Sequence, residues 1–587
     1  MQFDPQTKKN VESWLSGPYD ETTKAEIRQL IIGHPKQLAD AFYTTLAFGT
    51  GGIRGIMGVG TNRMNPYTVR GAAQGLANYI HKQPQTTPNP PSVLIGYDCR
   101  HHSREFAEET AMVLAGNNIH VYIFKKLRPS PLVSFGCRYK HCIAAIMITA
   151  SHNPPEYNGL KIYWSDGAQV LPPHDTGIVT EVNKIKELSQ VNAVSFNHPL
   201  ITTIDHEIDL AYIKTIHSLQ SYPDQNSQQG SKLKIVYSNL HGAGITMVPQ
   251  ALKSWGMTEV IDVEEQKLPD GNFPTVAFPN PEEKGALKLG IKLMLDQEAD
   301  ILIATDPDTD RMGVALRHQG KAVMLSGNQI ACLCLYHICE ALTAQGKMPK
   351  NGAFIKTIVT TELFKTIATS YKKPCFDVLT GFKYIGEKIR QWEEAPDGYQ
   401  YLFGGEESYG YLLGTHARDK DAVVSACLIS EAALNMKLKG KTLIDLLYQI
   451  YQEHGIYSER LLSLSYQGNE GREKICQMML QLRTQAPMAF AGVKVVAIED
   501  YKRSIKTWIQ KNSTETLTLP KSDVLLFWLE DGSKLVIRPS GTEPKIKLYC
   551  GVNKKHLQEN FETLEKEIIS CDTHAKKLLE ALKEALS

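Results

Sequence analysis

A serine in a short segment rich in turn-forming residues is the first candidate for chemistry. Ser151 lies within 149–159, Thr-Ala-Ser-His-Asn-Pro-Pro-Glu-Tyr-Asn-Gly, between apolar runs at 143–148 and 160–164 that predict buried strands. A loop at the end of a rigid strand holds a hydroxyl in place, which suits a nucleophile. The alternative is a turn whose serine caps a short helix. The segment alone is compatible with both interpretations.

Three carboxylates at alternating positions predict a metal site. Asp306, Asp308 and Asp310 follow an apolar run at 299–305. Carboxylates this close repel one another unless a cation lies among them, and oxygen ligands favour a hard ion such as Mg²⁺. An EF-hand is excluded, because Arg311 stands where that loop needs glycine and Arg317 where it needs glutamate. A solvated acidic turn is the alternative, and it is disfavoured directly after a buried strand.

Two further segments carry groups that suit a sugar phosphate. Glu406 and Ser408 are two residues apart, so in an extended backbone they face the same side and can bind sugar hydroxyls. The segment with Arg538, Ser540, Gly541 and Thr542 offers a guanidinium, two hydroxyls and a flexible backbone, which suits a phosphate. An ordinary surface turn is the alternative in each case.

The glycine-rich run at 48–60 is a further candidate loop. It lacks the phase of a dinucleotide fingerprint and the Gly-Lys-Ser/Thr of a P-loop. We expect a backbone that closely approaches a phosphate, with Arg54 as a charged clamp; the alternative is a turn with a solvated arginine.

Composition narrows the classes of partner. The chain has 587 residues, 64 Lys plus Arg against 63 Asp plus Glu, and a formal net charge of +1. This balance does not favour a nucleic-acid or membrane partner, and no apolar run approaches the ~20 residues that span a bilayer. The 11 cysteines are scattered without a Cys-x-x-Cys pair, and the N-terminus lacks a signal-peptide core. We therefore predict a cytoplasmic location.

The elements that must position these residues alternate along the chain. Strand and helix patterns follow one another from residue 68 to about 437, which predicts α/β layers, and several strands with two helices follow from about 456, which predicts an α+β unit. We expect a helix near 175–190, and a polar segment at 225–231 resembles a linker. We expect domains at 1–215, 216–326, 327–455 and 456–587.

Together these motifs resemble the α-D-phosphohexomutase family, most closely its long phosphoglucomutase branch. The segments are Thr149-Ala-Ser-His-Asn-Pro154, Asp306-Pro-Asp-Thr-Asp-Arg311, Gly405-Glu-Glu-Ser-Tyr-Gly410, Arg538-Pro-Ser-Gly-Thr-Glu-Pro544 and Arg54 within Gly-Gly-Ile-Arg-Gly. They stand in the family's order over nearly the whole chain. The resemblance implies three successive three-layer α/β domains with mixed sheets and a C-terminal α+β domain, four domains around a central cleft.

The resemblance also implies roles for individual residues. Ser151 would carry a phosphoryl group and, with Asp306, Asp308 and Asp310, hold Mg²⁺. Lys161 matches the family's proposed general acid/base, a role for which we expect neighbouring cations to lower its pKa, and His152 is the rival. Substrate contacts are implied for Arg54, Arg311, Thr380, Glu406, Ser408, Lys420, Arg538, Ser540, Gly541 and Thr542.

The implied reaction interconverts α-D-glucose 1-phosphate and glucose 6-phosphate through glucose 1,6-bisphosphate. Phosphomannomutase, phosphopentomutase and hexose-bisphosphate synthase activities are alternatives, because the segment around Glu406 has near variants in several branches. A phosphatase with Asp306 as nucleophile and a non-catalytic sugar-phosphate sensor are more distant ones. The oligomeric state, monomer or dimer, stays open.

Overall fold

The structure is a computed structural model that describes residues 3–49, 51–84, 90–466, 468–540, 544–555 and 561–586. Contacts within the chain divide it into two compact units. The first comprises Met1–Leu325, Gly386–Ala395 and Gly410–Leu434, and the second comprises Ser326–Ile385, Pro396–Tyr409 and Asn435–Ser587. Each unit is described by itself.

The first unit contains a mixed six-stranded sheet of order β1-β5-β4-β2-β3-β6. Strands β2, β3, β4 and β6 run parallel, whereas β5 pairs antiparallel with both β1 and β4. Its strands are β1 (Gly52–Ile56), β2 (Ser92–Tyr97), β3 (His120–Phe124), β4 (Ala144–Ile148), β5 (Tyr157–Trp164) and β6 (Ile201–Ile204).

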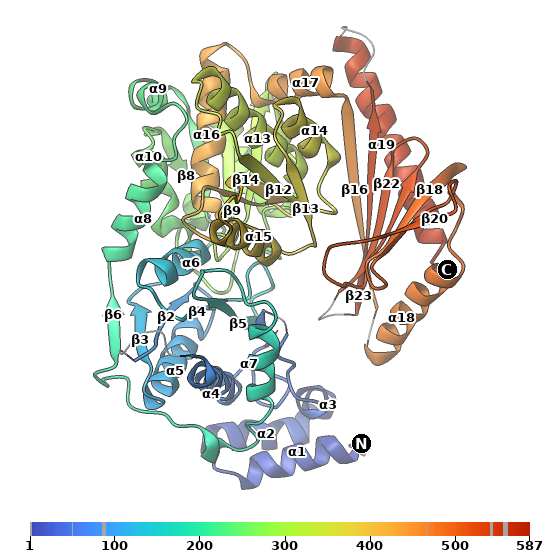
Figure 1. The fold of residues 1–587 in the computed structure, drawn as a ribbon. Helices are drawn as coiled ribbons and strands as arrows, with labels where there is room; N and C mark the ends of the chain where they lie inside the picture. Colours follow the sequence, from blue (N-terminus) through green and yellow to red (C-terminus); the bar gives the residue numbers. More distant parts are fainter. Residues whose placement is uncertain are drawn as a thin grey trace. The chain divides into compact units, whose positions relative to one another are not determined.

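Helices cover both faces of this sheet (Figure 1). Val93 and Ile95 of β2 lie in one core with α4 and α5, while Leu94 faces Gly136 of α6. Burial on both faces explains why β2 and β4 are continuous apolar runs rather than alternating ones. The helices are α4 (Pro66–Lys82), α5 (Ser103–Gly116), α6 (Ser130–Tyr139), α7 (His174–Val182) and α8 (Glu207–His217).

Three short helices precede the sheet: α1 (Pro5–Ser16), α2 (Glu21–Gly33) and α3 (Pro35–Phe42). Asp4 and Asp20 cap the first two, since each side chain accepts a backbone N–H of the first turn. Trp14 and Phe42 join their apolar faces in a small core.

A second sheet of the first unit has the order β11-β10-β9-β7-β8. Strands β7, β8 and β9 are parallel, and β10 returns antiparallel beside β9, so the β9–β10 turn carries the acidic triplet. Its elements are β7 (Ile235–Ser238), β8 (Val260–Asp262), β9 (Ile301–Thr305), β10 (Met312–His318), β11 (Lys321–Met324), α9 (Pro223–Gln229), α10 (Val248–Ser254), α11 (Glu264–Lys267) and α12 (Lys284–Asp296).

The second unit begins with a parallel group in which β12 (Gly352–Thr357) lies between β13 (Cys375–Val378) and β14 (Gln400–Glu406). The helices α13 (Gly327–Ala344), α14 (Glu362–Ser370) and α17 (Leu443–His454) accompany them. Two of the chain positions that separate the units fall within α15 (Phe382–Glu394) and α16 (Ala422–Leu438), and β15 (Gly410–Leu413) belongs to the first unit.

A C-terminal antiparallel sheet has the order β16-β23-β22-β21-β18-β19-β20, with β17 beside β18. Helix α19 packs against β16 and β23. The elements are β16 (Ile456–Ser465), α18 (Gly468–Thr484), β17 (Ala489–Phe490), β18 (Val493–Asp500), β19 (Ile505–Trp508), β20 (Ser513–Thr516), β21 (Leu525–Leu529), β22 (Lys534–Pro539), β23 (Lys545–Lys554) and α19 (Phe561–Glu584).

The α/β class and the mixed sheets are confirmed, and three local expectations are wrong. Part of the glycine-rich run is strand β1, because its backbone pairs with β5. The supposed linker at 225–231 is largely helical: Pro223 starts α9, and the buried Asn226 donates to Glu431 Oε1 over 2.6 Å. The helix expected near 175–190 ends at Val182. The predicted domain boundaries and central cleft stay predictions.

Candidate functional site

Ser151 begins the turn after β4 and lies beside the acidic triplet of the first unit. Its backbone is in the left-handed region (φ 51°), which is uncommon for a residue with a side chain. The hydroxyl donates to Asp306 Oδ2 over 2.9 Å and is 3.3 Å from Nδ1 of His152. Only 3% of Ser151 is exposed, so the sequence-predicted nucleophile and the sequence-predicted metal cluster are brought together in a buried setting.

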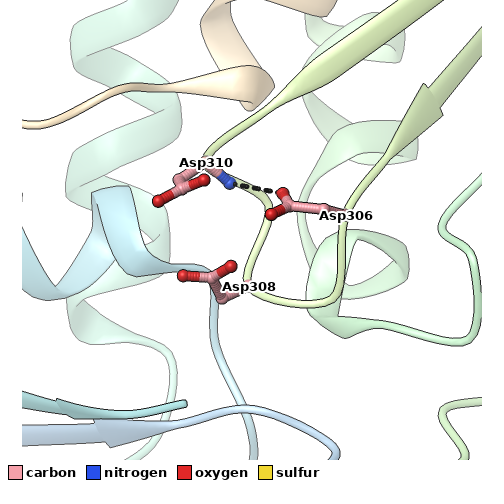
Figure 2. A group of neighbouring side chains, drawn as sticks. All are labelled: Asp306, Asp308 and Asp310. Atoms are coloured by element: carbon pink, nitrogen blue, oxygen red, sulfur yellow. Dashed lines mark hydrogen bonds between the residues drawn. The ribbon is translucent and has the colours of Figure 1, made fainter. Parts of the chain in front are cut away.

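Asp306, Asp308 and Asp310 converge because the tight β9–β10 turn places all three on one side (Figure 2). Oxygen atoms from each of them lie within 4.8 Å of one another. Asp306 Oδ1 accepts the backbone N–H groups of Asp310 (3.0 Å) and Arg311 (2.9 Å), which fixes the turn. Asp308 Oδ1 and Asp310 Oδ1 are buried without a hydrogen-bond partner among the described residues. A bound cation would satisfy buried carboxylate oxygens that lack a hydrogen bond.

Two carboxyl groups of the triplet, those of Asp306 and Asp310, have pKa values shifted in opposite directions. Burial, followed by the neighbouring Asp310 and Asp308, raises the pKa of Asp306 well above its usual range. Burial acts in the same direction on Asp310, but Lys161, Lys420 and Arg311 outweigh it and hold the pKa of Asp310 well below its usual value.

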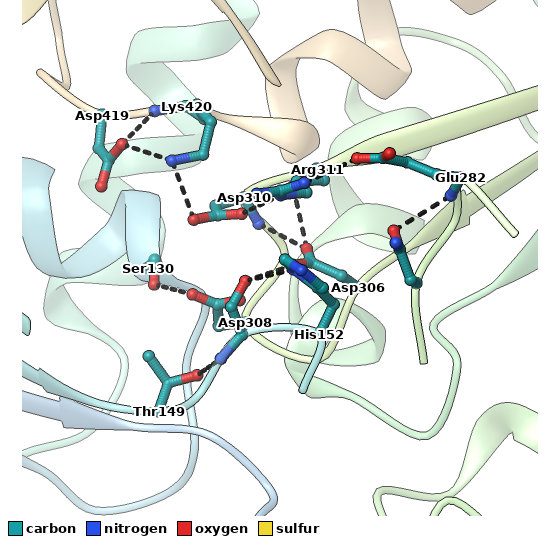
Figure 3. Close-up of polar contacts among 12 residues, drawn as sticks. Ser130, Thr149, His152, Glu282, Asp306, Asp308, Asp310, Arg311, Asp419 and Lys420 are labelled. Atoms are coloured by element: carbon teal, nitrogen blue, oxygen red, sulfur yellow. Dashed lines mark hydrogen bonds and ion pairs between the residues drawn. The ribbon is translucent and has the colours of Figure 1, made fainter. Parts of the chain in front are cut away.

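Two lysines meet at Asp310. Lys161 of β5 donates to Asp308 Oδ2 (2.6 Å) and Asp310 Oδ2 (2.9 Å). Lys420 Nζ lies 3.1 Å from the same Asp310 oxygen, and Figure 3 shows this contact. Burial lowers the pKa of Lys161, but Asp308, Asp310 and Asp419 raise it by more, so its pKa lies above the usual value. This differs from the sequence-based expectation of a lysine pKa lowered by neighbouring cations, because carboxylates are its nearest neighbours.

His152 is held in its neutral form. Burial, then the positive charges of Arg311 and Arg54, keep the pKa of this imidazole well below its usual value. A neutral ring beside the Ser151 hydroxyl can exchange a hydrogen bond with it but carries no charge at neutral pH.

Two arginines, Arg54 and Arg311, lie within electrostatic reach of His152. Arg54 of β1 donates from Nη1 to Asn153 Oδ1 (2.9 Å), and Arg311 donates to Glu282 Oε1 (2.7 Å), which also appears in Figure 3. By contrast, Arg418 is buried and donates to Glu393 Oε1 (2.5 Å). We therefore assign it a structural role.

The structure adds positioning residues that the sequence reasoning missed. Ser130 donates to Asp308 Oδ2 (2.7 Å), and Asp419 accepts from Tyr163 (3.0 Å), Gln169 (2.8 Å) and Lys420 Nζ (3.0 Å). Asp98 and Arg100 lie against the Ser151 turn. Their only sequence signal was polar residues directly after the buried strand β2.

Other predicted site residues lie in the second unit. Glu406 ends β14 and its Oε1 accepts the N–H of Gly381 (2.8 Å), next to Thr380, whose buried hydroxyl has no partner among the described residues. Ser408 follows at the half-exposed turn.

Arg538 lies near the end of β22, and Ser540 follows it, its N–H donating to Lys545 O (2.7 Å). Tyr549 on neighbouring β23 lies within electrostatic reach of both Glu407 and Arg538: burial and then Glu407 raise its pKa, and Arg538 lowers it. Gly541 and Thr542 lie outside the described residues.

All eleven cysteines are described, and none is in a disulfide. Within the described part of the chain, no helix is both long and apolar enough to cross a bilayer.

Comparisons with known proteins agree with this geometry. Family models for phosphoglucomutase/phosphomannomutase α/β/α domains I, II and III match residues 45–189, 211–320 and 326–454. The phosphoglucomutase of Staphylococcus haemolyticus (strain JCSC1435) is 38% identical over 532 residues, covering 90% of this chain and 93% of that protein. The phosphoglucomutase of Staphylococcus aureus (strain MRSA252) is 39% identical over 516 residues, covering 87% and 90%.

Solved structures show the same fold. The exocytosis-sensitive phosphoprotein pp63/parafusin of Paramecium, a phosphoglucomutase, has a TM-score of 0.67 at 17% identity, covering 92% of this chain and 96% of its own. A phosphoglucomutase/phosphomannomutase family protein of Burkholderia thailandensis has a TM-score of 0.63 at 17% identity, covering 91% and 98%.

Proposed function

The chain belongs to the phosphoglucomutase/phosphomannomutase family, and we propose that it is a phosphoglucomutase that interconverts α-D-glucose 1-phosphate and glucose 6-phosphate. The observation that carries the proposal is the hydrogen bond from Ser151 Oγ to Asp306, which brings a candidate phosphoryl carrier to the acidic triplet. The relatives at 38% and 39% identity are both phosphoglucomutases, which favours glucose over mannose or pentose.

The reaction we propose has two transfers through one residue. The bond from phosphorus to Ser151 Oγ breaks as a bond to a free hydroxyl oxygen of the sugar monophosphate forms. The hydroxyl gives up its proton and Ser151 Oγ gains one, so the products are glucose 1,6-bisphosphate and the unmodified serine. The bisphosphate turns over, and its other phosphoryl group returns to Ser151. Phosphoryl transfer depends mainly on positioning and on neutralising the charge of the moving group, and Lys161, Arg54 and Arg311 supply positive charge around the serine.

The residues present fit a divalent cation, which we propose to be Mg²⁺. Asp306, Asp308 and Asp310 would hold it together with an oxygen of phosphorylated Ser151, and the two buried oxygens without a hydrogen bond support this assignment. When bound, the ion would neutralise negative charge on the transferred group.

We further propose that Lys161 is the general acid/base. It is cationic, since three carboxylates raise its pKa, and so it can give a proton to a leaving oxygen. The neutral His152 would instead hydrogen-bond the serine or its phosphate. In the second unit, Glu406 and Ser408 would bind sugar hydroxyls, Thr380 would add a ligand contact, and Arg538 and Ser540 would bind the non-reacting phosphate.

Interconversion of sugar phosphates by the purified chain tests the proposal. With Mg²⁺ and a trace of glucose 1,6-bisphosphate, glucose 1-phosphate should be converted to glucose 6-phosphate faster than the 1-phosphates of mannose, glucosamine and ribose. Mannose 1-phosphate as the best substrate would assign phosphomannomutase instead. Failure with every sugar phosphate would favour a sensor, and label trapped on Asp306 rather than Ser151 would favour a phosphatase.

A further inference from the structure

One buried guanidinium binds the backbone of the turn that carries Ser151. Arg100 donates from Nη1 to the carbonyl oxygens of Pro154 (2.8 Å) and Tyr157 (3.0 Å), and from Nη2 to those of Ser151 (2.6 Å) and Asn153 (2.5 Å). Its side chain is 0% exposed. Four carbonyl groups of the turn therefore accept hydrogen bonds from the same side chain.

The contact between Arg100 and the Ser151 carbonyl is buried, and its contacts with the other three carbonyls are partly buried. A buried carbonyl left without a hydrogen bond destabilises the folded state. The guanidinium is a planar fork with five N–H groups, so it can reach several acceptors at fixed angles, whereas a lysine offers a single nitrogen. The chemistry of the turn thus calls for arginine specifically.

The turn also holds Ser151 in a conformation that it would not adopt by itself. A positive φ, here 51° at Ser151, is unfavourable for a residue with a Cβ, and such positions persist only where the surroundings enforce them. Arg100 holds the carbonyl of Ser151, while the N–H of Ser151 donates to Thr149 Oγ1 over 2.8 Å. Hydrogen bonds therefore hold both the N–H and the C=O group of Ser151.

Thr149 and Arg100 both contact the carboxylate of Asp98. Asp98 Oδ2 accepts from the Thr149 hydroxyl (2.6 Å) and lies 3.5 Å from Arg100 Nε, while its Oδ1 accepts the backbone N–H of Arg100 (3.0 Å). On its other side Arg100 stacks on the ring of Phe273, 5.0 Å from the ring centre, in the segment after α11. Arg100 is thus fixed independently of any substrate.

We propose that Arg100 is a positioning residue, which holds Ser151 in its left-handed conformation so that Oγ is aimed at Asp306 and at the incoming phosphoryl group. The inference rests on the proposed function, since it concerns the residue that would be phosphorylated. The guanidinium is occupied by the backbone of the turn, by Asp98 and by Phe273, so its effect would be on the geometry of Ser151 rather than on substrate affinity.

The test compares Arg100→Lys with Arg70→Lys. Arg70 is the control, because it is a partly buried arginine on α4, which shares a core with β2, and its guanidinium pairs with Glu109 instead (2.5 and 2.9 Å). Each purified variant is mixed with ³²P-labelled glucose 1,6-bisphosphate and Mg²⁺, well below its thermal midpoint. The rate of label transfer to Ser151, kcat, and KM for glucose 1-phosphate are measured.

For Arg100→Lys we expect label transfer and kcat to fall at least thirtyfold while KM stays within threefold. For Arg70→Lys we expect a lower thermal midpoint but label transfer within threefold of the unaltered chain. Label transfer within threefold in Arg100→Lys, or an equal loss in both variants, would overturn the inference. If the unaltered chain itself is not labelled on Ser151, the proposed function fails instead.

A milder variant keeps the test decisive if Arg100→Lys does not fold. Phe273→Leu removes the ring beneath the guanidinium and leaves every hydrogen bond of Arg100 possible. We expect label transfer to slow at least threefold with KM unchanged. An unchanged rate of label transfer in a folded Phe273→Leu would overturn the inference.

Discussion

The Ser151 hydroxyl donates a hydrogen bond to Asp306 Oδ2 over 2.9 Å, although the two residues are 155 positions apart in the chain. Ser151 follows β4 and Asp306 follows β9, which are buried strands of different sheets. The contact therefore joins the two sheets of the first unit at the carboxyl ends of these strands. The nucleophile is thereby placed at the acidic triplet before any substrate binds.

Replacing the serine should abolish turnover without unfolding the chain. Ser151→Ala removes the phosphoryl carrier and one hydrogen bond, so we expect kcat to fall by about four orders of magnitude or more. The thermal midpoint should change little, because the partner carboxyl, Asp306, keeps two backbone donors. Ser134→Ala, a buried serine that donates to Gly167 O, is the control for loss of a buried hydroxyl. Normal turnover in Ser151→Ala would contradict the assignment.

Weakening the acidic triplet should weaken metal binding. Asp308→Asn removes one negative charge and leaves Lys161 with Asp310 as its remaining strong partner. We expect half-maximal activity to require at least tenfold more Mg²⁺, and Mn²⁺ bound by the resting protein, followed by electron paramagnetic resonance, to weaken in parallel. Asp262→Asn, a carboxylate of the same sheet that pairs with Lys267, should leave both curves unchanged. If Asp308→Asn required the same Mg²⁺ concentration as the unaltered chain, the assignment of the triplet as the metal site would be wrong.

The roles of Lys161 and His152 can be distinguished by the kcat of variants at each position and by the pH dependence of kcat. Lys161→Met should lower kcat by roughly a hundredfold to a thousandfold, the usual range for a lost general acid or base. His152→Gln should cost much less, because the imidazole is neutral: burial, Arg311 and Arg54 hold its pKa well below the usual value. If His152 were the acid, kcat would instead rise as the pH falls toward that lowered pKa, and this rise would disappear in His152→Gln.

How much of this was predictable depends on the range of the interactions involved. The buried strands β2, β4 and β9 and the turns after them follow from local apolar runs and turn chemistry, so Ser151 and the triplet were found as separate candidates. That they touch each other was suggested only by the resemblance, because no local rule pairs residues 155 positions apart.

Where the sequence reasoning failed, long-range contacts overrode a local signal. The glycines of β1 suggested a loop, but antiparallel pairing with β5 makes Gly52–Ile56 a strand and Gly159 leaves room for it, since a Cβ there would lie 2.6 Å from Ile53 O. Arg100 carried no motif at all. Its role depends on the four carbonyls of a turn 51 or more positions away.

The guanidinium of Arg538 should contribute to substrate binding. Arg538→Ala removes the charged donor that we assign to the non-reacting phosphate, which costs about 1.5–3 kcal/mol and raises KM by roughly tenfold to a hundredfold. Arg460→Ala is the control, since Arg460 lies on β16 of the same sheet and pairs with Asp572 at the surface (2.8 Å). An unchanged KM in Arg538→Ala would exclude the phosphate assignment.

Glu459 should make the second unit less stable as the pH rises. Burial raises the pKa of its carboxyl to about 7, against the opposing effects of Thr361 and Lys534. In the unfolded chain the pKa is about 4.3, so the folded state binds more protons between these values. Stability is therefore full below about pH 4 and falls as the pH rises to about 7, above which the loss is constant.

Glu459→Gln should remove this dependence. The substitution keeps the shape of the side chain and cannot ionise, so the thermal midpoint should rise at pH 8, by an amount equivalent to about 2 kcal/mol after allowance for partial exposure, and change little at pH 4.5. Glu515→Gln, at an exposed position of β20, should show no such difference between the two pH values. A gain for Glu459→Gln that is as large at pH 4.5 as at pH 8 would show that packing rather than ionisation is responsible, and would contradict the prediction.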